Sequence, residues 1–156
     1  MSADVVRRLL STSFNIRTEK VTNWRDYLRL HCYPIDKFID EWPTNLASFQ
    51  AHLAEYCQST RNLALQLIVA ISESLGLHKD YMNTQLGKHA QHMVLNYYPA
   101  CSAIVNCDKE RISIPTFYCP SPEAVIRPTS EVVSDDAPAV YRQFTYGEYY
   151  EKFNGL

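Results

Sequence analysis

Polar and apolar residues alternate in two short stretches of the chain, 93–98 and 111–114. Because successive side chains of a strand point to opposite faces, each stretch predicts a strand whose polar residues share one side. These polar residues are Asn96 and Tyr98 in the first strand and Arg111 and Ser113 in the second. An arginine presents a planar fork to a carboxylate, and a hydroxyl two residues away can bind another oxygen of the same group. The strands therefore predict a pocket for a small acid, although on spacing alone an exposed arginine beside a polar strand residue is the commoner explanation.

Residues 48–75 have a different pattern, in which apolar residues recur with the period of a helix. Ser48 is placed to cap the start of this helix, and Gly76 supplies a left-handed stop. The pattern predicts one long amphipathic helix. Its positions step by threes and fours through Phe49, Leu53, Tyr56, Thr60, Leu63, Leu67, Ile71 and Leu75.

Weaker patterns predict the remaining elements. Residues 13–30 have an extended character that ends at Tyr33–Pro34, and residues 79–86 form a short helix that stops at Gly87. Thr145 and Glu148 have the spacing of a capping box, which predicts a helix near the C-terminus. Helices and strands together indicate an α+β fold.

Composition narrows the class of protein. At 156 residues and 46% hydrophobic content, the chain has the size of one domain. Its net charge of -2, without a long run of Lys or Arg, argues against a nucleic acid or an anionic membrane as partner. Its five cysteines lack Cys-x-x-Cys spacing, which indicates free thiols in a reducing compartment. No apolar run reaches the ~20 residues of a membrane span, so we expect a cytoplasmic protein.

One His-x-Asp triplet, His78 to Asp80, has the form of a metal-binding pair. It follows Gly76 at a junction between two predicted helices. A site with two imidazoles and a carboxylate needs rigid elements that aim all three at one point. We therefore interpret the triplet as an exposed helix start.

Other metal-binding side chains also lack partners in the sequence. His89 and His92 point to opposite faces of an extended segment, so we do not expect them to share a metal, and His92 is expected to be structural. Cys101 lies ten residues before Arg111, and a single thiolate does not make a site. The sequence predicts no metal site and no catalytic residue.

Several motifs together resemble the plant 2-oxoglutarate- and iron(II)-dependent dioxygenases. The two predicted strands carry Asn96-Tyr97-Tyr98-Pro99 and Arg111-Ile112-Ser113, which resemble two signatures of that family. Segments 24–34, 71–77 and 144–150 resemble its flavanone-hydroxylase-like and salicylate-hydroxylase-like (downy-mildew-resistance type) members. The resemblance implies that Asn96, Tyr98, Arg111 and Ser113 bind 2-oxoglutarate, with Arg111 and Ser113 at its distal carboxylate.

The resemblance also implies that a central part is missing. In the family, a His-x-Asp pair and a distal histidine hold the iron, between the two signatures; here only residues 100–110 separate them. At one strand per ~8 to 12 residues, the missing jelly-roll strands would need roughly fifty residues or more. We expect a partial double-stranded β-helix (jelly-roll) dioxygenase fold with N-terminal helical support and a deleted barrel centre. Residues 1–92 would be the N-terminal and helical region, and residues 93–156 the barrel remnant with a C-terminal tail.

The function that follows is that of a truncated oxidoreductase. Intact relatives are implied to use iron(II), 2-oxoglutarate and oxygen to hydroxylate or desaturate aromatic small molecules such as flavonoids or salicylate, in plant secondary metabolism. We expect this chain to bind no iron, to hold 2-oxoglutarate weakly at most, and to be inactive. Two alternatives stay open: a non-catalytic interaction or acid-binding module that self-associates through exposed strand edges, and a gene-model or splice artefact.

Overall fold

The computed structural model describes residues 26–46, 48–100, 109–136 and 138–154. Contacts divide the chain into two compact units that interleave along the sequence. The first takes residues up to Ala54 and then Gln91–Phe117, and the second takes Glu55–Ala90 and everything from Tyr118 onward. The extended character expected for residues 13–25 and the position of Cys101 lie outside the described residues. The predicted division into an N-terminal and helical region (residues 1–92) and a barrel remnant (residues 93–156) stays a prediction.

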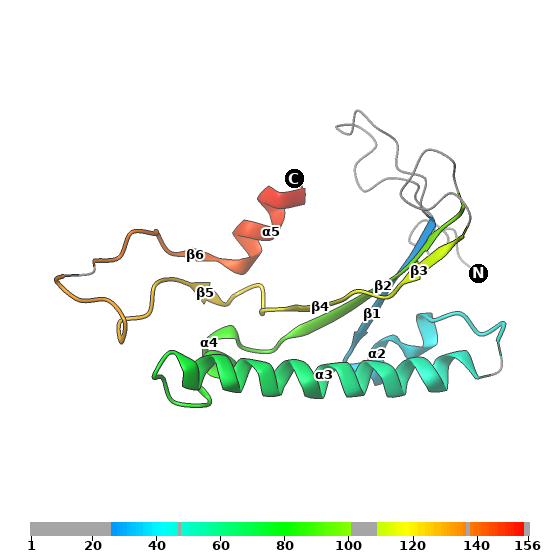
Figure 1. The fold of residues 1–156 in the computed structure, drawn as a ribbon, viewed down its shortest axis with the longest axis horizontal. Helices are drawn as coiled ribbons and strands as arrows, with labels where there is room; N and C mark the ends of the chain where they lie inside the picture. Colours follow the sequence, from blue (N-terminus) through cyan, green and yellow to red (C-terminus); the bar gives the residue numbers. More distant parts are fainter. Residues whose placement is uncertain (1–25, 47, 101–108, 137, 155–156) are drawn as a thin grey trace. The chain divides into compact units, whose positions relative to one another are not determined.

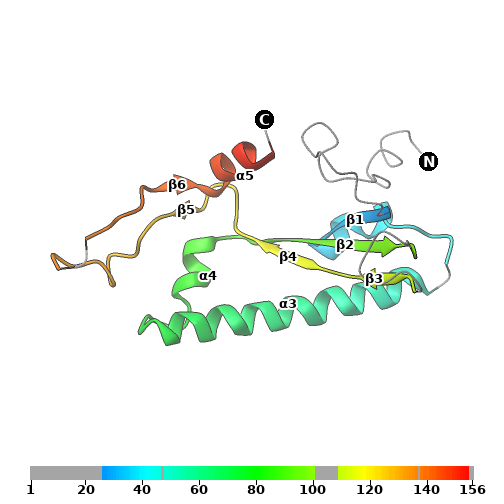
Figure 2. The same ribbon diagram turned by 45° about the horizontal axis from the view of Figure 1, so that its top comes forward.

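The first unit is built around β2 (Ala90–Tyr98), with which every other strand of its sheet pairs (Figure 1). β1 (Asp26–Tyr33) lies antiparallel along one edge of β2, and β3 (Arg111–Ser113) lies antiparallel along the other. β4 (Thr116–Cys119) also pairs with β2. Figure 2 shows β1, β2 and β3 side by side from a second direction. The strands expected at 93–98 and 111–114 are thus present, the first beginning three residues earlier and the second ending at Ser113.

Side-chain hydrogen bonds close the segment that follows β1. The strand ends at Tyr33, before Pro34, and the chain turns through α2 (Ile35–Phe38) and the 3-10 turn η1 (Ile39–Glu41). The indole Nε1 of Trp42 donates to the carbonyl of His31 at 2.9 Å, and the Trp42 side chain is buried. The amide of Gln50 donates to the carbonyl of Ile39 at 2.9 Å. These bonds tie the turn to β1 on one side and to the start of the next helix on the other.

The long helix α3 (Phe49–Ser74) is present, but its buried line differs from the expected series. The buried side chains on it are Leu53, Cys57, Arg61 and Ser72. Five members of the predicted apolar series are 40–56% exposed: Tyr56, Leu63, Leu67, Ile71 and Leu75. Tyr56 and Ile71 each lie one residue from a buried position, which is 100° around a helix, so they flank the buried face.

The second unit confirms the predicted stops. Gly76 and Gly87 have φ of 72° and 67°, a region that side-chain-bearing residues rarely adopt, and they follow α3 and α4 (Tyr81–Leu86) respectively. The Ser72 hydroxyl donates to the carbonyl of Ile68 at 3.0 Å and accepts the backbone N–H of Met82 at 3.3 Å, which ties the end of α3 to α4.

The C-terminal part of the second unit is a two-strand ladder followed by a helix. β5 (Val125–Ile126) pairs with β6 (Phe144–Thr145), and α5 (Tyr146–Asn154) follows directly. The predicted capping box is confirmed: the backbone N–H of Thr145 donates to Glu148 Oε2 at 2.7 Å, and the N–H of Glu148 donates to Thr145 Oγ1 at 3.2 Å.

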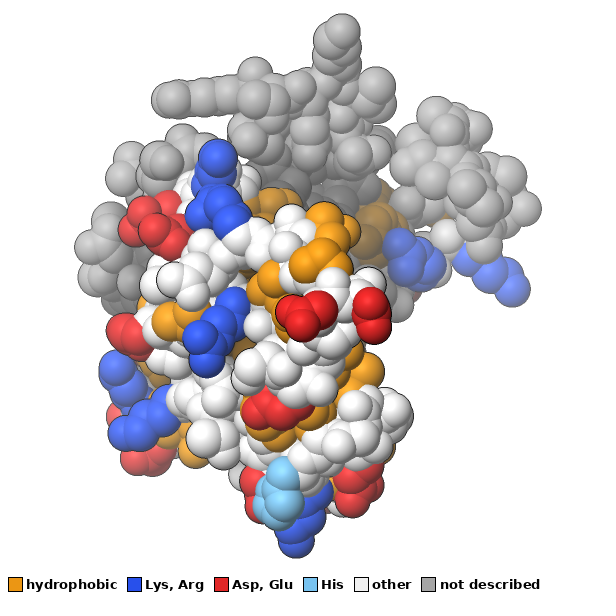
Figure 3. Space-filling model, turned by 90° about the vertical axis from the view of Figure 1, so that its left-hand side faces the viewer, with side chains coloured by type: hydrophobic (Ala, Val, Ile, Leu, Met, Phe, Trp, Pro, Cys, Tyr) orange, Lys and Arg blue, Asp and Glu red, His pale blue; other side chains and the backbone are white. Residues whose placement is uncertain are grey.

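The described surface and helices agree with the composition. On the face drawn in Figure 3, acidic and basic side chains are interspersed among hydrophobic ones. Among the residues that the structure describes, no helix combines the length and the apolar content needed to cross a membrane.

Two histidines face each other across β1 and β2. His31 and His92 are register partners, and their rings meet edge to face with centroids 4.5 Å apart. Burial, together with His31 and Arg29, lowers the pKa of His92 to about 4. The structural role expected for His92 is thus supported by its packing.

Stability should fall in acid through His92. Its folded pKa of about 4 lies below the 6.5 of an unfolded histidine, so the unfolded chain binds more protons between these values and stability is lost as the pH falls from 6.5 toward 4. Because the ring is half-buried, we expect a loss of about 1 to 2 kcal/mol, less than the full shift would give. Urea melts at pH 7 and pH 4.5 should show this loss in the wild type and not in His92→Gln. His78→Gln, at a side chain that is 74% exposed, should keep it, and an equal pH response in all three would contradict the assignment.

Candidate functional site

The four residues expected to bind an acid come together on the β2–β3 pair. Asn96 lies opposite Ser113, and Tyr98 lies opposite Arg111. Directly opposed residues of antiparallel strands share a face, with Cβ atoms about 4.5 to 5.5 Å apart. The predicted juxtaposition of Asn96, Tyr98, Arg111 and Ser113 is therefore present, although their role as a ligand site stays a prediction.

The inner half of this cluster is a hydrogen-bonded amide and hydroxyl. Asn96 is 4% exposed, and its Nδ2 donates to Ser113 Oγ at 3.2 Å. The Oδ1 of Asn96 is buried and has no partner within the described part of the chain. With its oxygen accepting from Asn96, the Ser113 hydroxyl still has a proton to donate. The Ser113 hydroxyl can thus donate a hydrogen bond to an acceptor such as a carboxylate while it accepts one from Asn96.

The outer half is a cation over an aromatic ring. The guanidinium carbon of Arg111 lies 3.9 Å from the centroid of the Tyr98 ring, and the Arg111 side chain is exposed. Stacking of this kind fixes the plane of the guanidinium and leaves its edge N–H groups in that plane. Within the described residues Arg111 forms no ion pair, so its charge stays available to an anion.

The opposite face of the same strands is apolar. Tyr97 and Ile112 are register partners and are 38% and 65% exposed, while Ile114 is 41% exposed. The Tyr97 hydroxyl donates to Glu110 Oε2 at 2.7 Å, and this bond raises the pKa of Tyr97. Ile112 and Ile114 thus leave an apolar patch exposed on this face.

Metal ligands do not gather in the described structure. His78 Nδ1 lies 3.7 Å from Asp80 Oδ2, and the two side chains are 74% and 60% exposed just before α4, as the helix-start interpretation expected. In the ranges from residue 26 to 154 that are described, no group of three or more His, Cys, Asp or Glu side chains is placed to hold a metal ion.

A polar cluster in the second unit escaped the sequence analysis. The His89 ring stacks on Tyr118 at 4.6 Å, and the guanidinium carbon of Arg61 lies 5.1 Å from the centroid of the same ring. Burial and the Arg61 charge lower the pKa of His89. A four-residue step along α3 from Leu53 through Cys57 to Arg61 was the available signal, since it marks Arg61 as buried.

Known proteins resemble the chain along most of its length. No protein-family model matches it. It is 42% identical to protein DMR6-LIKE OXYGENASE 2 and 34% identical to protein DOWNY MILDEW RESISTANCE 6, both of Arabidopsis thaliana, and 36% identical to flavanone 3-dioxygenase 2 of Oryza sativa subsp. japonica. Each alignment covers 92% of this chain. The chain belongs to the plant 2-oxoglutarate- and iron(II)-dependent dioxygenase family.

Within this dioxygenase family the chain is short. It spans 62–63% of the length of these three relatives. The alignment with DMR6-LIKE OXYGENASE 2 runs over 214 residues, so at least 58 of its positions (214 less 156) have no counterpart here.

A solved structure supports the fold. JOX2, crystallised in complex with 2OG, Fe and JA, matches 85% of this chain and 61% of its own chain, with a TM-score of 0.77 and 20% sequence identity. At this identity the match shows the fold alone. The expected α+β dioxygenase fold is thereby confirmed.

The cluster makes a prediction about coupling between the two strands. Asn96→Ala should destabilise the protein by about 1 to 2 kcal/mol and Ser113→Ala by about 1 kcal/mol, since each removes one partner of a partly buried hydrogen bond. The double variant should lose about 0.5 to 1.5 kcal/mol less than the two single losses combined, because both remove the same bond. Urea melts of the four proteins measure this difference. Losses that add fully would mean that the two side chains do not interact.

Proposed function

We propose that this chain is a non-catalytic member of its dioxygenase family. It keeps the part of the β2–β3 pair that binds an acid, here called the acid-binding arm (Asn96, Tyr98, Arg111 and Ser113), and it lacks the iron centre. The observation that carries the proposal is the placement of Arg111 and Ser113 opposite Tyr98 and Asn96 on one face of β2 and β3. At least 58 aligned positions of a relative are absent, and the two signatures are joined by a segment too short for further barrel strands. We infer that the barrel centre, with its metal ligands, is the part missing.

The described residues do not fit iron. A two-histidine, one-carboxylate site needs three side chains directed at one point with open positions opposite. His78 and Asp80 supply one imidazole and one carboxylate, both exposed and beside each other. No reaction step is therefore proposed for this chain, and the hydroxylation implied for its relatives, in plant secondary metabolism, is not assigned to it.

The arm itself suits one carboxylate. The Arg111 fork, held over Tyr98, would bind the carboxylate through charge-assisted hydrogen bonds. Ser113 would donate to an oxygen of the same group while it accepts from Asn96, an arrangement in which each bond polarises the next. The ligand proposed is a small dicarboxylate such as 2-oxoglutarate, held at its distal end.

Affinity should be low. Hydrogen bonds to a charged group contribute about 1.5 to 3 kcal/mol net, whereas association costs several kcal/mol in lost translation and rotation. Arg111 is exposed, so water competes for its N–H groups. A dissociation constant in the millimolar range or weaker is expected.

A titration with 2-oxoglutarate tests the proposal. Amide shifts of the wild-type chain should move at β2 and β3 with millimolar affinity, and Arg111→Ala should remove most of the response because the carboxylate loses the guanidinium next to Ser113. Ser113→Ala should weaken binding on the order of threefold. Arg127→Ala, another exposed arginine outside the cluster, is the matched control and should bind like wild type. Micromolar affinity, or binding unaffected by Arg111→Ala, would show that the arm is not the site.

A second candidate function is that of an interaction module. The flank of α3 formed by Tyr56, Leu63, Leu67, Ile71 and Leu75 is apolar, is 40–56% exposed and lies wholly within the second unit. Between residues 56 and 75 the only charged residues are Arg61, which is buried, and Glu73. Scarcity of charge at an exposed apolar flank favours a protein partner over an anionic membrane or a nucleic acid. The partner we propose is an intact chain of the same family.

Association through α3 should depend on this flank. Mixed with DMR6-LIKE OXYGENASE 2, the chain should form a complex visible by light scattering, and Leu67→Glu should weaken it at least tenfold by placing a charge in the interface core. Val140→Glu, at an 83% exposed residue elsewhere in the chain, is the control and should leave the complex unchanged. Equal association of wild type and Leu67→Glu would exclude the flank.

A further inference from the structure

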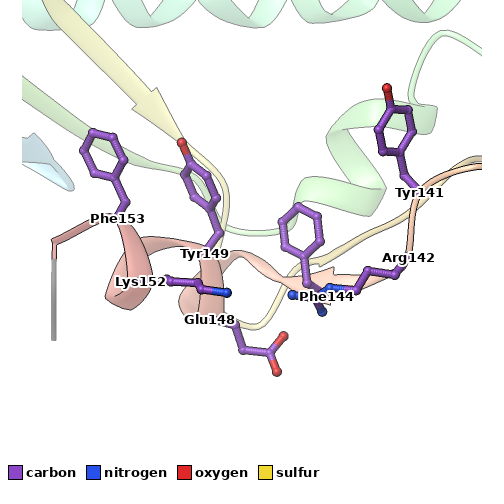
Figure 4. A pocket seen from close by; sticks show the side chains of 7 residues that line it. All are labelled: Tyr141, Arg142, Phe144, Glu148, Tyr149, Lys152 and Phe153. Carbon is purple, nitrogen blue, oxygen red and sulfur yellow. The ribbon is translucent and has the colours of Figure 1, made fainter.

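A cavity of about 460 Å³ lies where β6 runs into α5, within the second unit. Its size falls in the range of small-molecule sites. Four of its side chains are aromatic and two are cations (Figure 4). Nothing in the acid-binding arm contributes to it, since the residues of that arm belong to the first unit.

Aromatic rings form one wall of the cavity. Figure 4 shows the rings of Tyr141, Phe144, Tyr149 and Phe153 standing in a row on the same side of the backbone. Neighbouring rings contact each other, with Phe144 to Tyr149 at 6.2 Å and Tyr149 to Phe153 at 6.0 Å between centroids. A flat ligand inserted between two rings needs a separation of about 7 Å between them, which is twice the distance of a carbon-to-carbon contact. The rings of the row are closer together than that. The ligand would therefore lie across the row.

The aromatic side chains of the row are mostly exposed to solvent. Tyr141 is 80% exposed, Phe153 65% and Tyr149 49%, while Phe144 is half-buried. Large aromatic side chains gain free energy when covered, and aromatic ligands add ring-to-ring contacts of about 0.5 to 1.5 kcal/mol. An aromatic surface lying across the row would be favourable.

The charges of the cavity favour an anion. In Figure 4 the side chains of Lys152 and Arg142 run toward one another at the base of the rings, and their charged ends lie below Tyr149 and Phe144. The guanidinium carbon of Arg142 lies 5.8 Å from the Phe144 centroid. Among the described residues neither cation forms an ion pair. The only carboxylate of the cavity, Glu148, projects away from the rings and accepts the backbone N–H of Thr145.

We infer that this cavity binds a planar aromatic anion, with its rings across the Phe144, Tyr149 and Phe153 row and its acidic group between Arg142 and Lys152. A neutral aromatic compound would stack on the rings and make no ionic contact with the two cations. An aliphatic acid would use the cations and lose the stacking. The site prefers ligands that combine both features.

Binding of 2-naphthoate to the full chain, followed by its fluorescence, tests the inference. Lys152→Gln and Arg142→Gln should each weaken binding on the order of threefold to fivefold, the magnitude of an exposed charge contact. Lys79→Gln, an exposed lysine outside the cavity, should bind like wild type. 2-Naphthalenemethanol and cyclohexanecarboxylate should both bind more weakly than 2-naphthoate.

Three results would overturn the inference: equal affinity for the alcohol and the acid, no loss in either cation variant, or loss in Lys79→Gln as large as in Lys152→Gln. Thermal melts show whether each variant is folded, and Phe153→Leu offers a second route, since it keeps an apolar side chain and removes one ring. Arg111→Ala should leave naphthoate binding unchanged, which separates failure of this site from failure of the acid-binding arm.

Discussion

The register between β2 and its neighbours is the constraint on which the first unit depends. Because side chains alternate along a strand, the pairing of Asn96 with Ser113 and of Tyr98 with Arg111 puts all four on one face. A slip of one residue would exchange them for Tyr97 and Ile112, which are the exposed apolar residues of the other face. The same strand pairs His92 with His31 on its other edge. One strand thus fixes both the candidate acid site and the contact between the His31 and His92 rings.

Local chemistry in the sequence predicted the elements well where the determining contacts are close in the chain. The capping box at Thr145, the left-handed Gly76 and Gly87 and the strand at Asn96 each depend on a few neighbouring residues. Of the buried line of α3 only Leu53 was predicted, because Arg61 and Ser72 are polar and the predicted series follows the apolar residues instead. The β5–β6 ladder, two residues long on each strand, leaves no periodicity to detect.

An acid-binding site and a metal centre depend on different parts of an iron-dependent oxygenase, so a chain can keep the first without the second. An arginine and a hydroxyl two residues apart on one strand can recognise a carboxylate with little else in place, since the ladder with the neighbouring strand fixes both. A metal centre needs three ligands from elements that position each other. The proposed absence of the barrel centre would remove the second kind of site and could leave the first intact. The apolar strand face and the α3 flank then remain as surfaces that association could cover.

The central claim is that chemistry was lost with the absent segment, and a matched pair of proteins tests it most directly. Iron-dependent release of succinate from 2-oxoglutarate would be measured for this chain and for a chimera that carries the corresponding segment of DMR6-LIKE OXYGENASE 2 between Cys101 and Ser102. The account predicts no release above a protein-free control for the chain, and chelator-sensitive release for the chimera. Chelator-sensitive turnover by the chain alone would contradict it, because the chain would then hold an iron centre of its own.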